Sequence, residues 1–381
     1  MSLVFDDIDR EHQGPRKAGE TQFSYLNRSG RVEAGRVRSL VEDWITRYPE
    51  SDLTALVARL RSTIDAAHHS AFFELAVHEL LVRTGHTIVA VEPKVPNSNR
   101  RPDFLVEAPD GERFYVEVVT SIAQTPQEMA AEKRLNDAVC IVDKADAEFH
   151  FLDVQIEGKP KEQVSAKALR PALANWIAAL PVTDAVKDQP PFVYAEHGMT
   201  LTIGAFLRNT PRREAGGAIG LQNMEPFWGT PGDGIRESVE RKASRYGDLD
   251  LPYVVAVNAM SDYKSEEDAI DAMFGSPCVV VRRYEDGRTE TAESRNGDGV
   301  WQGANGPRKK GLSAILSTER LAPWSVGQRR ARLIRNPWAT RPLPPIPLGI
   351  DELNPIDGRL EKTEGQPFRE LFNLPASWPE D

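Results

Sequence analysis

Three acidic residues stand where their carboxylates could act together: Glu74, Asp103 and Glu117. Asp103 directly follows Pro102, and Glu117 lies within the apolar run 116–119. An ionised carboxylate in an apolar strand is costly unless a cation pairs with it. Clustered carboxylates supply the hard oxygen ligands that Mg²⁺ and Mn²⁺ bind. We therefore expect a divalent cation, Mg²⁺ or Mn²⁺, to compensate the charge of Glu117.

The predicted elements around these acids indicate how they would be positioned. Residues 68–86 predict a helix that ends at Gly85, with Glu74 on the flank of its apolar stripe. The segments "TIVAVEPKV", "PDFLVEA" and "RFYVEVVTS" predict three strands, and "PDG" predicts a tight turn between the last two. Asp103 opens the second strand and Glu117 lies in the third. Antiparallel pairing of these strands would bring the two carboxylates into one ligand shell.

The elements that follow extend this pattern. We expect a helix over residues 126–145, a strand over 149–158 and another helix over 165–180. The order helix, three strands, helix, strand, helix predicts a mixed α/β core.

A helix glutamate, then "PD", a hairpin and "VEV" resembles the PD-(D/E)xK nuclease superfamily, which has the restriction-endonuclease-like fold. The resemblance covers about residues 66–180 and includes the αβββαβ element order with a mixed sheet. It implies that Asp103 and Glu117 bind the metal together with the backbone carbonyl of Val118, and that Glu74 supports the site from the helix as a third catalytic and metal-binding acid. It also implies a divalent-metal-dependent nuclease that hydrolyses phosphodiester bonds of DNA. The ion would activate water and stabilise charge on the scissile phosphate.

The chain departs from the motif at the lysine two residues after the second acid, where it has Val119. Replacement lysines could come from Lys133 in the helix over 126–145, from Lys94 in the loop before Asp103, or from Lys242 in "ERKASRY". The departure leaves an alternative function open, a catalytically degenerate member that binds nucleic acid or a protein partner without cleavage. A third possibility is an interaction protein whose N-terminal helices and Pro-rich tail contact a partner.

Each acid also has a purely structural interpretation. Asp103 could be a turn residue after Pro102. Glu117 could be a structural ion-pair partner of Arg101 or Arg113. Glu74 could be an ordinary surface glutamate of a helix.

The charge balance limits the kind of nucleic-acid binding. The chain has 381 residues and a formal net charge of −10, which argues against indiscriminate coating of nucleic acid. A local basic groove is still compatible with this charge, although a solvated surface is the alternative for each basic cluster. The candidate clusters are Arg208–Arg212–Arg213, Arg308–Lys309–Lys310 and Arg329–Arg330–Arg332–Arg335.

Cysteine content and hydropathy indicate the compartment. Cys140 and Cys278 are far apart and form no metal or redox spacing, so we expect reduced thiols. The N-terminus has no signal-peptide pattern, and no apolar run has membrane-spanning length. These features predict a cytoplasmic protein without a membrane partner.

The segments predict four regions along the chain. We expect a flexible arm over 1–22, a helical N-terminal segment over 23–65 and the restriction-endonuclease-like α/β core with additions over 66–275. A C-terminal extension with a Pro-rich tail would occupy 276–381.

Overall fold

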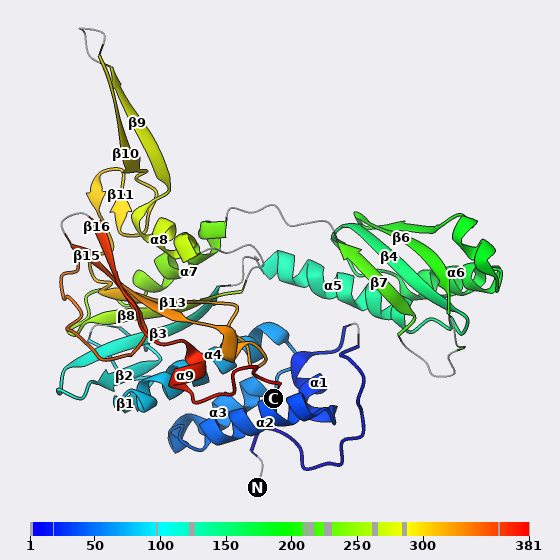
Figure 1. The fold of residues 1–381 in the computed structure, drawn as a ribbon, viewed down its shortest axis with the longest axis horizontal. Helices are drawn as coiled ribbons and strands as arrows, with labels where there is room; N and C mark the ends of the chain where they lie inside the picture. Colours follow the sequence, from blue (N-terminus) through cyan, green and yellow to red (C-terminus); the bar gives the residue numbers. More distant parts are fainter. Residues whose placement is uncertain are drawn as a thin grey trace. The chain divides into compact units, whose positions relative to one another are not determined.

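The computed structural model describes most of the chain as helices, strands and ordered loops. The described residues are 3–17, 19–96, 98–121, 126–208, 211, 217–224, 231–260, 266–283, 288–356 and 359–380. They form a mixed α/β protein with a large mixed sheet, which confirms the predicted class (Figure 1).

The chain divides into two compact units. The first, here the core unit, comprises Met1–Gln13, Gln22–Ala123 and Gly229–Asp381. The second, here the inserted unit, comprises Gly14–Thr21 and Gln124–Trp228. This division differs from the expected regions, because 124–228 lies outside the core unit, whereas most of the segment before 66 and all of the segment after 275 lie within it.

Eight of the described strands form one sheet in the core unit, in the order β1-β2-β3-β8-β13-β14-β15-β16. Strands β1, β2 and β3 are antiparallel neighbours, whereas β8 runs parallel to both β3 and β13. The strands span Thr87–Val91, Phe104–Glu107, Arg113–Ser121, Tyr253–Ala259, Ala314–Glu319, Ala331–Arg335, Asp351–Ile356 and Arg359–Thr363.

The first part of this sheet follows the sequence prediction closely. Helix α4 (Asp65–Arg83) ends just before Gly85, whose φ of 82° lies in the left-handed region that favours glycine. Strands β2 and β3 form the expected hairpin, closed by a hydrogen bond from the Ala108 N–H to the Glu112 carbonyl at 2.8 Å. The local patterns of apolar residues and turn residues were therefore sufficient to predict α4 and the first three strands.

The next elements of the sheet come from further along the chain than we expected. Helix α5 (Pro126–Asp143) and strand β4 (His150–Gly158) do form, but both belong to the inserted unit. Helix α7 (Pro231–Ala243) and strand β8 follow β3 in the core unit instead. The expectation that the core runs continuously over 66–180 is therefore wrong, because local patterns do not reveal which strand pairs with β3.

The two faces of the sheet carry separate hydrophobic clusters. Alternate residues of β3 point to opposite faces. Phe114, Val116 and Val118 pack with helix α4, whereas Tyr115 and Val119 pack with α7 and with α8 (Glu266–Phe274). Glu117 shares its parity with Tyr115 and Val119, so it faces α7.

The C-terminal third of the chain completes the sheet rather than trailing from it. Strands β13 to β16 are consecutive neighbours in the sheet, and Phe368 and Phe372 of the α9 region (Phe368–Leu371) are buried in the α4-side cluster. Two short strands, β11 (Gln302–Gly303) and β12 (Gly306–Pro307), pair with each other. The expected Pro-rich tail is therefore part of the core unit.

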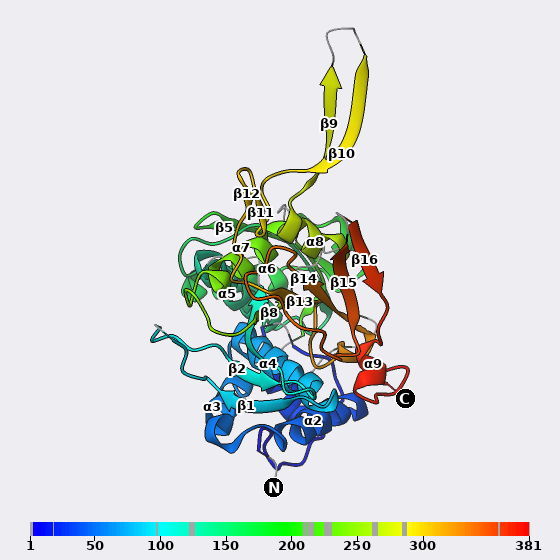
Figure 2. The same ribbon diagram turned by 90° about the vertical axis from the view of Figure 1, so that its left-hand side faces the viewer.

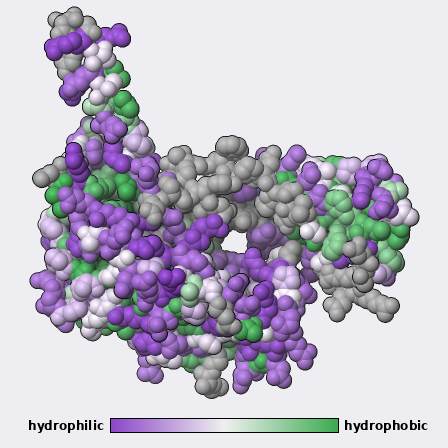
Figure 3. Space-filling view, in the orientation of Figure 1, coloured by the Kyte–Doolittle hydropathy of each residue, from purple (hydrophilic) through white to green (hydrophobic). Residues whose placement is uncertain are grey.

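One hairpin extends away from the rest of the core unit (Figure 2). Its strands β9 (Pro277–Arg283) and β10 (Thr289–Arg295) are antiparallel and form a separate two-stranded sheet. Val279, Val280 and Val281 are all exposed, and hydrophobic patches are visible along this ribbon in Figure 3. Both faces of the hairpin are therefore open to solvent.

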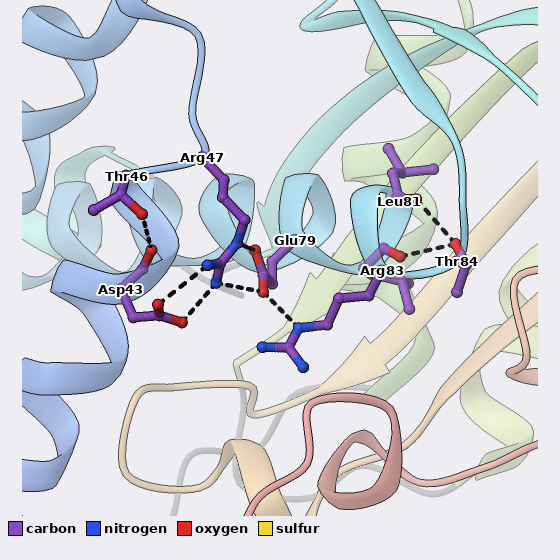
Figure 4. A network of polar contacts seen from close by, with 8 residues as sticks. Asp43, Thr46, Arg47, Glu79, Leu81, Arg83 and Thr84 are labelled. Atoms are coloured by element: carbon purple, nitrogen blue, oxygen red, sulfur yellow. Dashed lines mark hydrogen bonds and ion pairs between the residues drawn. The ribbon is translucent and has the colours of Figure 1, made fainter.

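The N-terminal helices pack into the core unit through apolar contacts and buried ion pairs. They are α1 (Gln22–Arg28), α2 (Val32–Ile45) and α3 (Glu50–Leu60). Glu79 of α4 is fully buried and accepts hydrogen bonds from Arg47 and Arg83 (Figure 4). The segment expected to be a flexible arm includes Val4, which is fully buried and donates its N–H to Glu42 at 2.9 Å.

The inserted unit has its own sheet and hydrophobic core. Four of the described strands have the order β5-β6-β4-β7, and helices α5 and α6 (Ala166–Ala178) contribute to a cluster with β4 and β6. Leu135, Ala138, Val139 and Val142 of α5 are buried in this cluster. The other strands are Phe192–Glu196, Met199–Leu207 and Ile219–Met224, and a 3₁₀ helix spans Asp184–Asp188.

Candidate active site

Glu117 is the centre of a buried polar cluster. Its side chain is 1% exposed, and its Oε1 accepts hydrogen bonds from Lys242 Nζ and, at 3.0 Å, from Arg245 Nη1. Its Oε2 accepts a hydrogen bond from Tyr246 Oη. Two cations and a phenol therefore compensate the carboxylate that the sequence places in an apolar strand.

Helix α7 and the turn after it supply all three of these partners. The helix packs across β3 and β8 through Ile235 and Val239, which leaves its C-terminal end over Glu117. Arg245 and Tyr246 lie in the turn after the helix, where the Arg245 N–H donates to the Lys242 carbonyl at 3.0 Å, and their side chains reach Glu117 together with that of Lys242. Burial and the Glu117 carboxylate raise the pKa of Tyr246, so its hydroxyl remains a donor.

Asp103 lies next to Glu117, directly before β2. The pairing of Phe104 with Val116 puts Asp103 and Glu117 at adjoining positions of the hairpin. Asp103 Oδ2 accepts a hydrogen bond from the backbone N–H of Val118 at 2.6 Å. Burial raises the pKa of Asp103 to about 7, with further increases from the carboxylates of Glu117 and Glu74. The Val118 N–H and Lys242 oppose this increase.

Glu74 is held by a different set of partners. Its oxygens accept hydrogen bonds from Arg59 Nη1 at 2.6 Å and Nη2 at 2.8 Å, and from Tyr48 Oη at 2.8 Å. The residue is buried, so it is not an ordinary surface glutamate of the helix. Its charge reaches Asp103, since it contributes to the raised pKa there. Glu74 is therefore an electrostatic neighbour of the acid pair, neutralised on its own side by Arg59.

The three candidate lysines differ in where they lie. Lys242 contacts Glu117 directly. Lys94 is exposed, and within the described residues it has no hydrogen bond or ion pair to the acids. Lys133 belongs to the inserted unit, where it pairs with Asp137 at 3.1 Å. Val119 is buried against the α7 side of the sheet, as predicted for an apolar strand residue.

The predicted ion-pair partners of Glu117 have other contacts. Arg113 pairs with Glu107 at 2.6 Å. The Arg101 guanidinium contacts the backbone carbonyl of Glu92 at 3.5 Å, and the Arg101 carbonyl oxygen lies 2.8 Å from Tyr246 Oη. The idea that Glu117 has a structural ion pair is correct in kind, but its partners are Lys242 and Arg245.

Arg245 and Tyr246 were not among the candidate site residues. The signal that could have identified them is the spacing in "ERKASRY", which puts two cations and a phenol at positions i, i+3 and i+4. Their distance in the sequence from Glu117, 128 and 129 residues, concealed the contact.

Comparison with known proteins adds no relative. No protein-family model, curated protein or solved structure matches this chain. Among the described helices, none has both the length and the apolarity needed to cross a membrane.

Within the described parts of the chain, no three or more His, Cys, Asp or Glu side chains form a group that could hold a metal ion. The site instead offers two adjoining carboxylates, Asp103 and Glu117. This set fits Mg²⁺, which is commonly bound through one or two carboxylates and completes its shell with waters and substrate phosphate oxygens. Burial first, and then the carboxylates of Glu117 and Glu74, raise the pKa of Asp103, and a cation bound beside Asp103 would lower it.

Proposed function

We propose that this chain is a divalent-metal-dependent nuclease that hydrolyses phosphodiester bonds of DNA at Asp103, Glu117 and Lys242. The observation that carries the proposal is the contact between Lys242 Nζ and Glu117 Oε1 beside Asp103. The contact brings the two acids Asp103 and Glu117 together with a lysine. The motif has its lysine two residues after the second acid, where this chain has Val119.

The order of elements in the core unit supports the same proposal. Helix α4, strands β1 to β3, helix α7 and strand β8 follow one another, with an insertion between β3 and α7. The sheet order β1-β2-β3-β8, with α4 and α7 on opposite faces, is similar to the αβββαβ arrangement of the restriction-endonuclease-like fold. On this basis the resemblance includes a lysine, Lys242, which lies on helix α7 rather than on β3.

Asp103 and Glu117 would hold Mg²⁺ or Mn²⁺, and the Val118 carbonyl is the third ligand that the resemblance implies. When bound, the ion lowers the pKa of a water molecule and stabilises charge on the phosphate. Lys242 lies beside Glu117, where its ammonium can pair with a phosphate oxygen. Tyr246 holds the second oxygen of Glu117, which fixes the direction of the carboxylate.

Cleavage assays test the proposal directly. The purified chain is incubated with plasmid and linear DNA in Mg²⁺ or Mn²⁺, beside Glu117→Gln and a sample in EDTA. We expect cleavage by the wild type alone, and thermal melting of Glu117→Gln shows whether it is folded. Cleavage that survives both the substitution and EDTA would come from another site or a contaminant, and would overturn the proposal.

A second function is favoured by the same contacts. Lys242 and Arg245 already neutralise Glu117, so the acid pair is less negative than a site built to take up a cation. A protein that binds nucleic acid or a protein partner without cleavage would have such a site. The thermal shift caused by Mn²⁺ separates the two functions. A shift that Asp103→Asn removes supports the nuclease, and no shift in the wild type supports binding without cleavage.

A further inference from the structure

Basic side chains from two distant segments meet beside the candidate active site. Lys309 Nζ donates a hydrogen bond to Ser244 Oγ at 2.6 Å, and Arg308 Nη2 pairs with Glu240. Ser244 precedes Arg245, which is bonded to Glu117. The segment Gly306–Gly311, here the basic loop, is thereby attached to the C-terminal end of α7.

The backbone of the basic loop is held in a specific conformation. Lys309 has a φ of 49°, in the left-handed region that residues other than glycine rarely adopt. The Leu312 N–H donates to the Lys309 carbonyl at 3.0 Å, and the Thr340 N–H donates to the Lys310 carbonyl at 2.8 Å. Residues in such conformations persist only where surrounding contacts enforce them, and they cluster at ligand-binding positions.

The charges of this region are only partly compensated. Glu240 forms an ion pair with Arg308, and Glu117 forms ion pairs with Lys242 and Arg245. Within the described residues, Arg241, Lys309 and Lys310 form no ion pair, and Arg241 and Lys310 are exposed. Exposed positive charge therefore lies next to the acid pair, although the chain as a whole has a net charge of −10.

The other predicted basic clusters have less uncompensated charge, because most of their described side chains already bond to carboxylates or backbone carbonyls. Arg330 pairs with Asp351 at 2.6 Å, Arg332 with Glu319 at 3.3 Å and Arg335 with Glu352 at 3.4 Å. Arg208 donates to backbone carbonyls within the inserted unit, and Arg212 and Arg213 lie outside the described residues. The basic loop and the end of α7 therefore offer a basic surface close to Glu117 whose charges are less compensated than those of the other predicted clusters.

We propose that Arg241, Lys309 and Lys310 form a contact surface for the sugar-phosphate backbone of a nucleic acid, which leads the strand to Glu117. This proposal rests on the proposed function for its ligand class. The surface would bind phosphates irrespective of base sequence, because exposed lysine and arginine side chains pair with the phosphate groups, which are the same in every sequence. The Lys309–Ser244 bond holds the basic loop against the helix that carries Lys242 and Arg245.

Binding is measured without cleavage, so the two proposals can fail separately. Fluorescence anisotropy in EDTA follows labelled duplex and single-stranded DNA at several salt concentrations. The test variant is Arg241→Ala with Lys310→Ala, which removes two exposed charges and keeps the Lys309–Ser244 bond. The matched control is Arg359→Ala with Lys362→Ala, which removes the same charge from β16 at the opposite edge of the sheet.

We expect the test variant to bind more weakly on all sequences, with a salt slope reduced by about two, since each lost phosphate contact lowers it by about one. The control should keep the wild-type slope. Equal slopes for the test variant and wild type would overturn the contact surface, whether or not the chain cleaves DNA. A reduced slope without any cleavage would retain the surface and reject the nuclease. Thermal melting of both variants establishes that they are folded.

Discussion

Lys242 on α7 donates a hydrogen bond to Glu117 on β3, although 125 residues separate them in the chain. The lysine reaches the acid because α7 packs on the same face of the sheet to which Glu117 and Val119 point. A lysine at position 119 would point to that same face. The helix therefore supplies from outside the strand the positive charge that the strand itself lacks.

Replacing Lys242 with Met should remove cleavage while leaving the fold intact. Arg245 and Tyr246 would still compensate Glu117, so the carboxylate would not be left unpaired. We expect the rate of plasmid cleavage in Mg²⁺ to fall by about 10²-fold or more, the scale typical of losing one electrostatic contact to the transition state.

Lys133→Met is the matched control for this variant, because Lys133 pairs with Asp137 in the inserted unit and its side chain is 77% exposed. It should cleave like the wild type. Equal activity of Lys242→Met and the wild type, both melting cooperatively, would exclude Lys242 from the reaction.

The ion pairs around Glu79 should contribute strongly to stability, independently of any activity. Arg47 lies between the exposed Asp43 and the buried Glu79, and Arg83 binds Glu79 from the next turn of α4 (Figure 4). Glu79→Gln leaves two arginines without their buried counter-charge, so the free energy of unfolding should fall by roughly 3 kcal/mol.

Asp43→Asn removes an exposed partner of the same arginine and should cost less than about 1 kcal/mol. Urea unfolding of the two variants gives the comparison. If Asp43→Asn costs as much as Glu79→Gln, the buried position of Glu79 is not what makes its ion pairs important.

Asp103 should make the metal-free protein less stable as the pH rises from about 4 to about 7. Its pKa in the folded protein is about 7, above the ordinary value of 3.8, because of burial and the nearby carboxylates. Between these values the folded state retains a proton that the unfolded state has released, so the free energy of unfolding decreases with pH. Above about 7 both states are ionised and the decrease ends.

Asp103→Asn lacks this titration. Urea unfolding in EDTA between pH 4.5 and 8 should show the variant gaining stability relative to the wild type up to about pH 7, and a constant difference above it. A difference that is the same at every pH would show that Asp103 titrates normally.

The β9–β10 hairpin should open far more readily than the central sheet. Two strands alone are marginally stable in water, and this pair exposes Val279 and Val281 on one face and Val280 on the other. Hydrogen exchange followed by mass spectrometry should show weak protection in 277–283 and strong protection in β8, whose residues are all buried. Equal protection of both would mean that the hairpin is covered in solution, for example by a second copy of the chain.

The amino-acid sequence by itself determined the elements and the candidate acids. The stripe of α4 ended by Gly85, the turn after Ala108 and the apolar alternation of β3 depend on neighbours within a few residues, so their patterns are visible in the chain. The sequence also showed that Glu117 in an apolar strand needs a partner.

Only the tertiary structure decided what that partner is. Strands β3 and β8 pair in parallel, but residues 124–228 of the inserted unit separate them in the chain. No local pattern encodes which distant strand pairs with β3. That pairing brings α7 over β3 and places Lys242, Arg245 and Tyr246 on Glu117, while Glu74 turns to Arg59. The contacts form because burying a carboxylate is favourable only where cations converge on it, and convergence is a property of packing rather than of sequence spacing.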